Sequence, residues 1–502
     1  MRRSIVAAVL ALSTALTVLT AAASWAEPQG HARADHALTR AQRIVDGTAS
    51  PGPAKRVEAT LAMRDLFLSL PDLDTSERRQ AASVLARPTD GDADQYGHGY
   101  TVDARRTCSG HFCLHWVSST DDAPPSRTWV TRNLATLNRV WRHHVGTLGY
   151  RPPVQDGTRG GNKLFDVYLK ELGSQGLYGY CAPERRKPGT KFLASGYCVL
   201  DNDFARSQYG VPPDDSLRVT AAHEFFHAIQ FAYDYGEDQW FMEATATWME
   251  ERFADDVNDN RQYLSYGQVG QPAEPLDFFN SSGFNQYGNW PFFEYLSSRY
   301  GNRIVKRVWE QAGAFEGAPD KYSTRALRSV LGGRGAFESV FRTYTAHNTI
   351  PGRTYAEGDS WPHAPVDRRW VLSADNLEGE RSFRIDHLAS RNAVLRPDES
   401  LAGGHWRGRV TVDAPTDDTS PTAYLLIRRK SGRIVEKAVH LGPAGNGSAE
   451  FPFGHDTIRS VTVTLANAST RFSCWHEMSY SCQGRSRDDD QLFNLKVAAF
   501  TG

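Results

Sequence analysis

The spacing of apolar positions changes twice along the chain and divides it into three kinds of segment. From residue 27 to about residue 95, apolar residues recur at helical spacing, so we expect a helical N-terminal segment. From 96 to 360, runs typical of strands give way to longer helical patterns. After 361, short alternating runs are separated by turn residues. The pattern predicts an α+β protein that ends in a β-sandwich.

The middle segment divides into two parts. Its first part combines strands with one long amphipathic helix, whereas its second part, from Tyr287 to Tyr344, is helical and rich in aromatic residues. We therefore expect a lobe with a small sheet and helices, followed by an all-helical lobe. The elements predicted for the first lobe are strands over 112–118, 164–169 and 192–204 and a helix from Trp129 to Trp141.

The first 26 residues have the composition of an export signal. Arg2 and Arg3 precede an apolar run rich in alanine and leucine, and Ser24-Trp25-Ala26 supplies small residues around a cleavage position. The run is nearly long enough to cross a bilayer, so an uncleaved anchor is the alternative. We expect cleavage, and afterwards a secreted, extracellular protein without membrane contact.

The net charge limits the kinds of partner to expect, and the cysteine content predicts disulfides. Lys and Arg number 57 and Asp and Glu 58, a net charge of −1 that gives no reason to expect nucleic acid as a partner. The six cysteines of an exported chain should be oxidised. Among the possible pairings, the one between sequence neighbours keeps each bridge within one domain. Its bridges are Cys108–Cys113, Cys181–Cys198 and Cys474–Cys482.

A helical stretch near residue 225 reads H-E-x-x-H. His223 and His227 are four residues apart and therefore share a helix face, where their imidazoles can hold one metal ion. Glu224, the next residue along, can reach a water molecule bound to that metal. Taken alone, the motif has another interpretation, two helix histidines beside a surface glutamate.

The next predicted helix supplies a third ligand. It follows a polar break at 234–238, and two helices joined by so short a turn lie antiparallel and adjacent. Glu243 lies early in it among apolar residues, and a semi-buried carboxylate needs a partner or a metal. We expect His223, His227 and Glu243 to bind one zinc ion (Zn2+) per chain, with a fourth position open.

Three other carboxylates lie within reach of these histidines in the sequence. Asp234 and Glu237 belong to the turn, where solubility and helix capping already explain them. Glu250 lies two helical turns beyond Glu243, about 10 Å along the axis, so both cannot bind one ion. Because the two glutamates are seven residues apart, they share a helix face. We therefore expect Glu250 to contact one of the ligand histidines without binding the metal itself.

H-E-x-x-H followed by W-x-x-E-x-x-A-x-x-x-E resembles the gluzincins, the clan of thermolysin and the zinc aminopeptidases. Within that clan, the sequence of these two stretches is similar to that of a group of secreted bacterial metalloproteases. The resemblance implies a two-lobed zinc peptidase fold, with His223, His227 and Glu243 as zinc ligands and Glu224 as general base. It also implies that Glu250 matches a carboxylate behind the ligands in the aminopeptidase branch.

The chain departs from the clan's pattern in two ways, and it also lacks the metzincin pattern. Only fifteen residues separate His227 from Glu243, a shorter gap than the clan usually shows. Thr247 occupies the position of the thermolysin-type aspartate that orients a histidine, so that contact must come from elsewhere. The metzincin pattern fails, because Gln230 and Tyr233 stand where its glycine and third histidine belong.

Two further sites are less directly indicated. Tyr287, at the leading edge of the helical lobe, is the candidate for a hydroxyl that stabilises the transition state, although such an aromatic stripe is usually core. Asp255, Asp256 and Asp259 form an acidic turn after the second helix. This turn is either a solvated loop or a structural Ca2+ site.

These observations predict a secreted, monomeric zinc metallopeptidase that cleaves a peptide or protein substrate through a zinc-activated water and the base Glu224. An endopeptidase is favoured over an aminopeptidase, because no site for a free amino terminus is visible. The expected domains are a signal peptide (1–26), the helical segment (27–95, a propeptide or a permanent arm), a catalytic domain (96–360) and an accessory β-sandwich (361–502).

Two other functional classes compete with this one. A non-catalytic exported binding or adhesion protein could keep the fold and a bound zinc, but it would be expected to lose Glu224 or a ligand. A carbohydrate-acting enzyme would need a cleft with paired carboxylates, which the sequence does not reveal.

Overall fold

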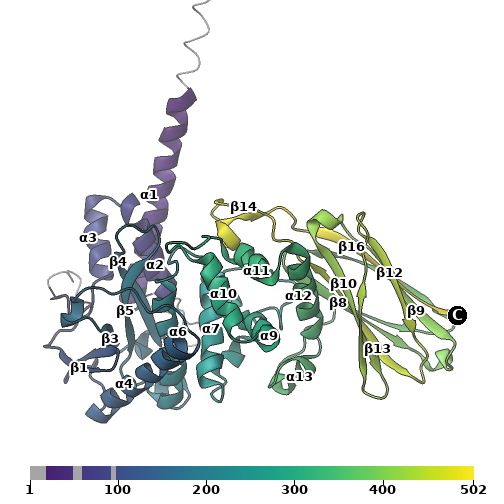
Figure 1. Ribbon diagram of the computed structural model, residues 1–502, viewed down its shortest axis with the longest axis horizontal. Helices are drawn as coiled ribbons and strands as arrows, with labels where there is room; N and C mark the ends of the chain where they lie inside the picture. Colours follow the sequence, from purple (N-terminus) through teal and green to yellow (C-terminus); the bar gives the residue numbers. More distant parts are fainter. Residues whose placement is uncertain (1–17, 49–58, 92–97) are drawn as a thin grey trace, which may run out of the picture. The chain divides into compact units, whose positions relative to one another are not determined.

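The computed structural model describes residues 18–48, 59–91 and 98–502, with side chains from residue 30 onward (Figure 1). Residues 1–17 of the predicted signal peptide lie outside this part. The chain is mixed α+β with a β-rich C-terminal region, as expected. It forms two compact units, one of Met1–Ala135, Gln155–Arg186 and Ala194–Pro213, the other of Thr136–Val154, Lys187–Leu193 and Asp214–Gly502.

A five-stranded sheet with the order β1-β2-β3-β5-β4 forms the centre of the first unit. Its inner strands β2, β3 and β5 run parallel, and β1 and β4 pair antiparallel at the edges. β2 and β5 are buried along their whole length, which explains their continuous apolar runs. The strands are β1 (Arg105–Ser109), β2 (Phe112–Trp116), β3 (Phe165–Lys170), β4 (Gly179–Arg186) and β5 (Ala194–Asp201).

Helices of the first unit begin where local signals place them. The Asp74 carboxylate accepts the backbone N–H groups of Ser76 and Glu77, while Glu77 accepts the N–H of Asp74, so α3 starts with a complete capping box. The predicted amphipathic helix is also present, as α4. The helices are α1 (Val18–Val45), α2 (Ala59–Ser69), α3 (Thr75–Val84), α4 (Arg127–Trp141) and α5 (Arg206–Tyr209).

A buried arginine fastens the N-terminal segment to this sheet. The Arg87 guanidinium is almost inaccessible and lies 2.7 Å from Asp166 of β3 and 2.6 Å from Glu184 of β4. Asp156 lies 2.5 Å away on the same group. Because a buried charge is stable only when paired, residues around Arg87 are part of the packed unit.

The second unit contains the predicted helix hairpin, α6 (Pro213–Gln230) and α7 (Gln239–Ala254). Both helices are buried around nearly their whole circumference, so neither shows a clear polar face. The helices predicted after them are also present: α8 (Asn285–Gly288), α9 (Trp290–Tyr300), α10 (Arg303–Ala312), α11 (Ser323–Leu331), α12 (Arg334–His347) and α13 (Pro351–Thr354).

The C-terminal part is a sandwich of two antiparallel-rich sheets, with strand orders β11-β10-β13-β8-β6 and β12-β9-β16-β7. Apolar side chains of both sheets share one core, among them Leu425, Val463 and Val497. The strands are β6 (Arg368–Leu372), β7 (Glu378–Ile385), β8 (Ala389–Pro397), β9 (Trp406–Asp413), β10 (Pro421–Arg429), β11 (Ile434–Val439), β12 (Asn446–Pro452), β13 (Ile458–Asn467) and β16 (Gln491–Thr501), beside a small hairpin of β14 (Phe472–Ser473) and β15 (Arg485–Ser486).

Buried polar contacts join the sandwich to the helices of the same unit. His387, in the turn between β7 and β8, lies 2.9 Å from Asp277 and 2.5 Å from Asp489. The second oxygen of Asp277 accepts the hydroxyl of Ser481 at 2.7 Å. The sandwich is therefore held against the loop that follows α7 by an imidazole with a carboxylate on each side.

Cys482, the residue after Ser481, contacts the start of α7. The N–H of Cys482 donates to Asp238, which directly precedes α7, at 2.6 Å. The other oxygen of Asp238 accepts the hydroxyl of Ser323, at the start of α11, at 2.5 Å. A C-terminal loop thus helps to fix the helix that carries Glu243.

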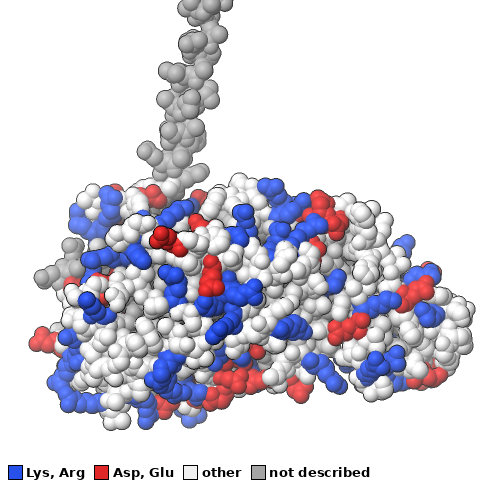
Figure 2. Space-filling view, viewed as in Figure 1, with Lys and Arg blue, Asp and Glu red and all other residues white. Residues whose placement is uncertain are grey.

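The three predicted disulfides are present, Cys108–Cys113, Cys181–Cys198 and Cys474–Cys482. They are compatible with an exported protein. Within the described residues, no helix combines the length and the apolar composition needed to cross a membrane. Basic and acidic side chains are interspersed on the face that Figure 2 displays, in keeping with the balanced composition.

Replacing Arg87 with methionine should lower the free energy of unfolding by about 3–5 kcal/mol, because three carboxylates would stay buried without their cation. Urea denaturation of the mature protein measures this loss. Arg409, paired with Glu450 on the surface, provides the control. Arg409→Met should cost less than about 1 kcal/mol, and equal losses in the two variants would contradict the role given to Arg87.

The His387 contacts should make stability depend on pH. Burial opposes protonation of His387, but Asp277 and Asp489 raise its pKa to about 10, from an ordinary value of 6.5. A group whose pKa is raised in the folded state stabilises the fold in full at pH values below its ordinary pKa. This stabilisation is lost as the pH rises toward the pKa of the folded state.

The free energy of unfolding should therefore fall between about pH 7 and pH 10. His387→Gln should remove much of this slope, because the amide does not titrate. Denaturation of both proteins at several pH values in this range gives the two slopes. An unchanged slope in the variant would assign the pH dependence to other groups.

Candidate metal centre

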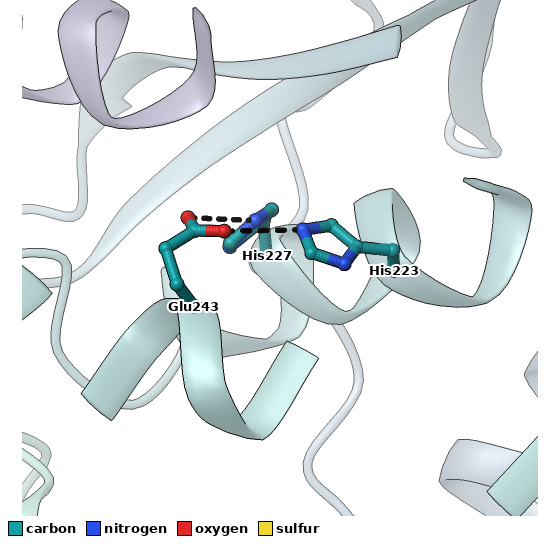
Figure 3. A group of neighbouring side chains, drawn as sticks. All are labelled: His223, His227 and Glu243. Carbon is teal, nitrogen blue, oxygen red and sulfur yellow. Dashed lines mark ion pairs between the residues drawn. The ribbon is translucent and has the colours of Figure 1, made fainter. Parts of the chain in front are cut away.

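The helix hairpin brings the three predicted ligands together (Figure 3). His223 and His227 lie one turn apart on α6, and Glu243 faces them from α7. The Nε2 atom of each histidine lies 3.3 Å from a different oxygen of Glu243. One ligand atom from each of the three residues can be chosen so that all lie within 4.8 Å of one another.

The electrostatics of this group are those of a carboxylate between two bases. Burial opposes ionisation of Glu243, but His227, His223 and the nearby Tyr287 hydroxyl together lower its pKa below the ordinary value. Burial lowers the pKa of His227 to about 4, which leaves its imidazole neutral. Burial also opposes protonation of His223, yet Glu243 and Glu250 raise its pKa well above the usual range.

This arrangement fits a divalent cation. Glu243 is completely buried, and neither of its carboxylate oxygens has a well-aligned hydrogen-bond donor among the described residues. Two imidazole nitrogens and one carboxylate oxygen form the mixed donor set found at catalytic zinc centres, where a fourth position stays open. His223, His227 and Glu243 could therefore hold one metal ion.

A second group lies behind each histidine. The Nδ1 atom of His223 is 2.7 Å from an oxygen of Glu250, where sequence reasoning expected a supporting carboxylate. The Nδ1 atom of His227 is 2.7 Å from the side-chain oxygen of Gln230. Sequence reasoning noted Gln230 only as a departure from another motif. Its position three residues after His227, on the same helix face, was the available signal.

Glu224 and Tyr287 both lie at this centre. Glu224 directly follows His223, and both residues are buried, each 8% exposed. The Tyr287 ring lies parallel to the His223 ring, with centroids 6.0 Å apart. Its hydroxyl is close enough to Glu243 to lower the pKa of that carboxyl. Tyr287 thus lies beside the candidate ligands, whereas the role of Glu224 as the base stays a prediction from its place next to His223.

Carboxylates of the turn between the helices have other partners. Asp234 accepts the backbone N–H of Gly236 at 2.7 Å, and Glu237 accepts the N–H groups of Asp238 and Ser323 at 2.7 and 3.1 Å. Both satisfy backbone groups, as capping residues do. However, the turn is buried rather than exposed, because α11 packs against it.

The acidic turn after α7 differs from the expectation for calcium. Asp256 pairs with Arg218, and Asp259 begins a short 3-10 helix. Among the described residues, the acidic group that gathers here is instead Glu251, Asp255 and Glu357, with ligand atoms within 4.8 Å of one another. Two members of this group lie outside the predicted turn.

Comparison with known proteins gives a family but no activity. Residues 208–326, which include every candidate residue of the centre, match a family of unknown function (DUF6055). No curated protein matches the chain.

Two solved structures show distant similarity. The pre-peptidase C-terminal domain of a collagenase from Bacillus anthracis is 7% identical, with a TM-score of 0.16, over 27% of this chain and 97% of that domain. A family GH115 4-O-methyl-α-glucuronidase is 8% identical, with a TM-score of 0.15, over 58% of this chain and 38% of that enzyme. The chain is thus similar, over the part that includes α6 and α7, to a family whose function is not known.

Proposed function

We propose that this protein is a secreted zinc metallopeptidase of the gluzincin type. The observation that carries the proposal is the completely buried Glu243 carboxylate, each of whose oxygens faces one Nε2 atom of the H-E-x-x-H histidines at 3.3 Å. A metal explains why two oxygens and two ring nitrogens converge in a buried place without well-aligned hydrogen bonds.

The donor set and its surroundings favour hydrolysis over a structural role. Three protein ligands leave one tetrahedral position for water or substrate, whereas structural zinc sites use four protein ligands. A sheet-containing segment before α6 and helices after α7 follow the order of elements in gluzincins.

Each side chain has a definite task in the proposed reaction. His223, His227 and Glu243 would hold the ion, and zinc, when bound, acidifies a water molecule and polarises the scissile carbonyl. Glu224 accepts the proton of the attacking water and later delivers it to the nitrogen of the leaving amine as the C–N bond breaks. Tyr287 can donate its hydroxyl to the oxygen that becomes negative during the attack.

The chain's other features support export. Three disulfides form within short stretches of sequence, which suits an oxidising compartment. The first 26 residues carry a basic start, an apolar run and a small-residue cleavage position. Both features suit an extracellular peptidase.

The metal assignment is tested by zinc affinity. Glu243→Ala should abolish tight zinc binding, because it removes one of three ligands, whereas Glu250→Ala should weaken binding by about 10–100-fold, because it removes only the support of His223. Competition with a chromogenic chelator measures both variants beside the parent protein, which should hold about one zinc per chain. If Glu250→Ala loses the metal and Glu243→Ala keeps it, the ligand assignment is reversed.

The base assignment is tested by Glu224→Gln. The amide has the same shape but cannot accept a proton, so peptide cleavage should fall by about 10²–10⁴-fold while zinc content and stability stay close to those of the parent. Cleavage of a peptide library, with and without chelator, measures the activity. The exposed Glu316 offers a control, since Glu316→Gln should change nothing. Full activity in Glu224→Gln would refute the proposed role.

A zinc-loaded parent protein that cleaves no peptide would point instead to the non-catalytic binding class.

A further inference from the structure

Gln230 makes side-chain contacts to both helices of the metal centre. It is completely buried at the end of α6. Its side-chain oxygen lies 2.7 Å from Nδ1 of His227, and its nitrogen lies 2.9 Å from the carbonyl oxygen of Met242 and 3.2 Å from Oγ1 of Thr245. Met242 and Thr245 flank Glu243 on α7. One amide therefore connects one candidate ligand to the backbone beside another.

The partners on α7 determine which way the amide points. The carbonyl oxygen of Met242 can only accept a hydrogen bond. The hydroxyl of Thr245 has a close acceptor of its own, the carbonyl oxygen of Phe241 at 2.6 Å, and it also accepts the indole N–H of Trp309 at 3.2 Å. Its oxygen therefore faces Gln230 as an acceptor. Both positions require the NH₂ group of Gln230, so its carbonyl oxygen must face His227.

This orientation sets the hydrogen on His227. Because the amide oxygen can only accept, the Nδ1 atom of His227 must carry the hydrogen. A neutral imidazole has one N–H, so its Nε2 atom keeps a lone pair. Nε2 is the atom that lies 3.3 Å from Glu243 and faces the position of the metal. The ring is thus held in the tautomer that a metal requires.

We propose that Gln230 is a positioning residue that fixes the tautomer of His227 and its spacing from Glu243 before any metal binds. The inference rests on the proposed metal centre and extends it to the metal-free protein. His223 is supported differently, by the carboxylate of Glu250 at 2.7 Å, so the two histidines are oriented by groups of different charge.

Gln230→Met is the principal test. Methionine has a similar volume but neither function of the amide, so zinc affinity should fall by about 10–100-fold, as it does when a group behind a metal ligand is lost. In the metal-free variant, nitrogen NMR of the histidine rings should show His227 in a mixture of tautomers. In the parent protein it should show hydrogen on Nδ1 alone.

Gln230→Glu separates the two tasks. A carboxylate accepts the Nδ1 hydrogen of His227 but cannot donate to Met242 or Thr245. This variant should keep the tautomer of His227 while it loses the connection to α7. Its zinc affinity should fall less than that of Gln230→Met.

Gln268 provides the matched control. It is another buried glutamine of the same unit, and its nitrogen donates to the carbonyl oxygens of Glu274 and Leu388 at 2.8 and 2.6 Å. Gln268→Met should lower stability to a similar degree, yet it should leave zinc affinity and the His227 ring unchanged. A general effect of removing a buried amide would appear in both variants.

The outcomes decide between the alternatives. The proposal is overturned if Gln230→Met binds zinc within about threefold of the parent, where loss of such a group normally costs at least tenfold. It is also overturned if His227 in the metal-free parent carries its hydrogen on Nε2. A parent protein that binds no zinc refutes the proposed function, whereas the ring NMR still determines whether Gln230 sets the tautomer.

Discussion

Burial of the Glu243 carboxylate is the constraint on which the centre of this protein depends. A carboxylate inside a protein costs several kcal/mol unless charged or hydrogen-bonding groups compensate it. Here the Nε2 atom of the basic His223 lies 3.3 Å from one oxygen, while the Nε2 atom of His227 lies 3.3 Å from the other and offers a lone pair to a cation. Other residues of the hairpin hold the two imidazoles in place: Glu250 contacts His223, and Gln230 contacts His227.

The groups behind the imidazoles are not alike, and the difference has a physical reason. His223 lies against the carboxylate of Glu250 and is the more basic ring, since two negative neighbours favour its proton. His227 lies against the neutral amide of Gln230 and remains an uncharged ring. In the absence of metal, one ring can therefore share charge with Glu243 while the other keeps a lone pair available. A divalent cation would take over both functions.

The β-sandwich contributes to the position of α7. Asp238 precedes this helix and receives the N–H of Cys482, while Asp277 connects Ser481 to His387 of the sandwich. These carboxylates are buried between elements that are far apart in sequence but belong to one compact unit. The C-terminal region thus contacts the start of the helix that carries Glu243 directly.

Features that depend on neighbours in the chain could be predicted from the sequence. The i and i+4 spacing of His223 and His227, the capping box of Asp74 and Glu77 and the short disulfides all follow from local geometry, and each is present. The facing position of Glu243 also followed, because a short turn leaves two helices few ways to pack.

Other features depend on burial and on contacts between residues that are distant in the sequence, so they could be seen only in the folded chain. The sequence around Arg87 gives no sign of its role, because its partners Asp166 and Glu184 come from strands far along the chain. The edge strands β1 and β4 lack an alternating apolar pattern, because β1 is exposed almost throughout and β4 is buried only in its middle residues. Gln230 could be recognised only when α7 supplied acceptors for its amide. Sequence spacing determines which residues share a helix face, whereas the partner of a buried polar group is set by the elements that pack against it.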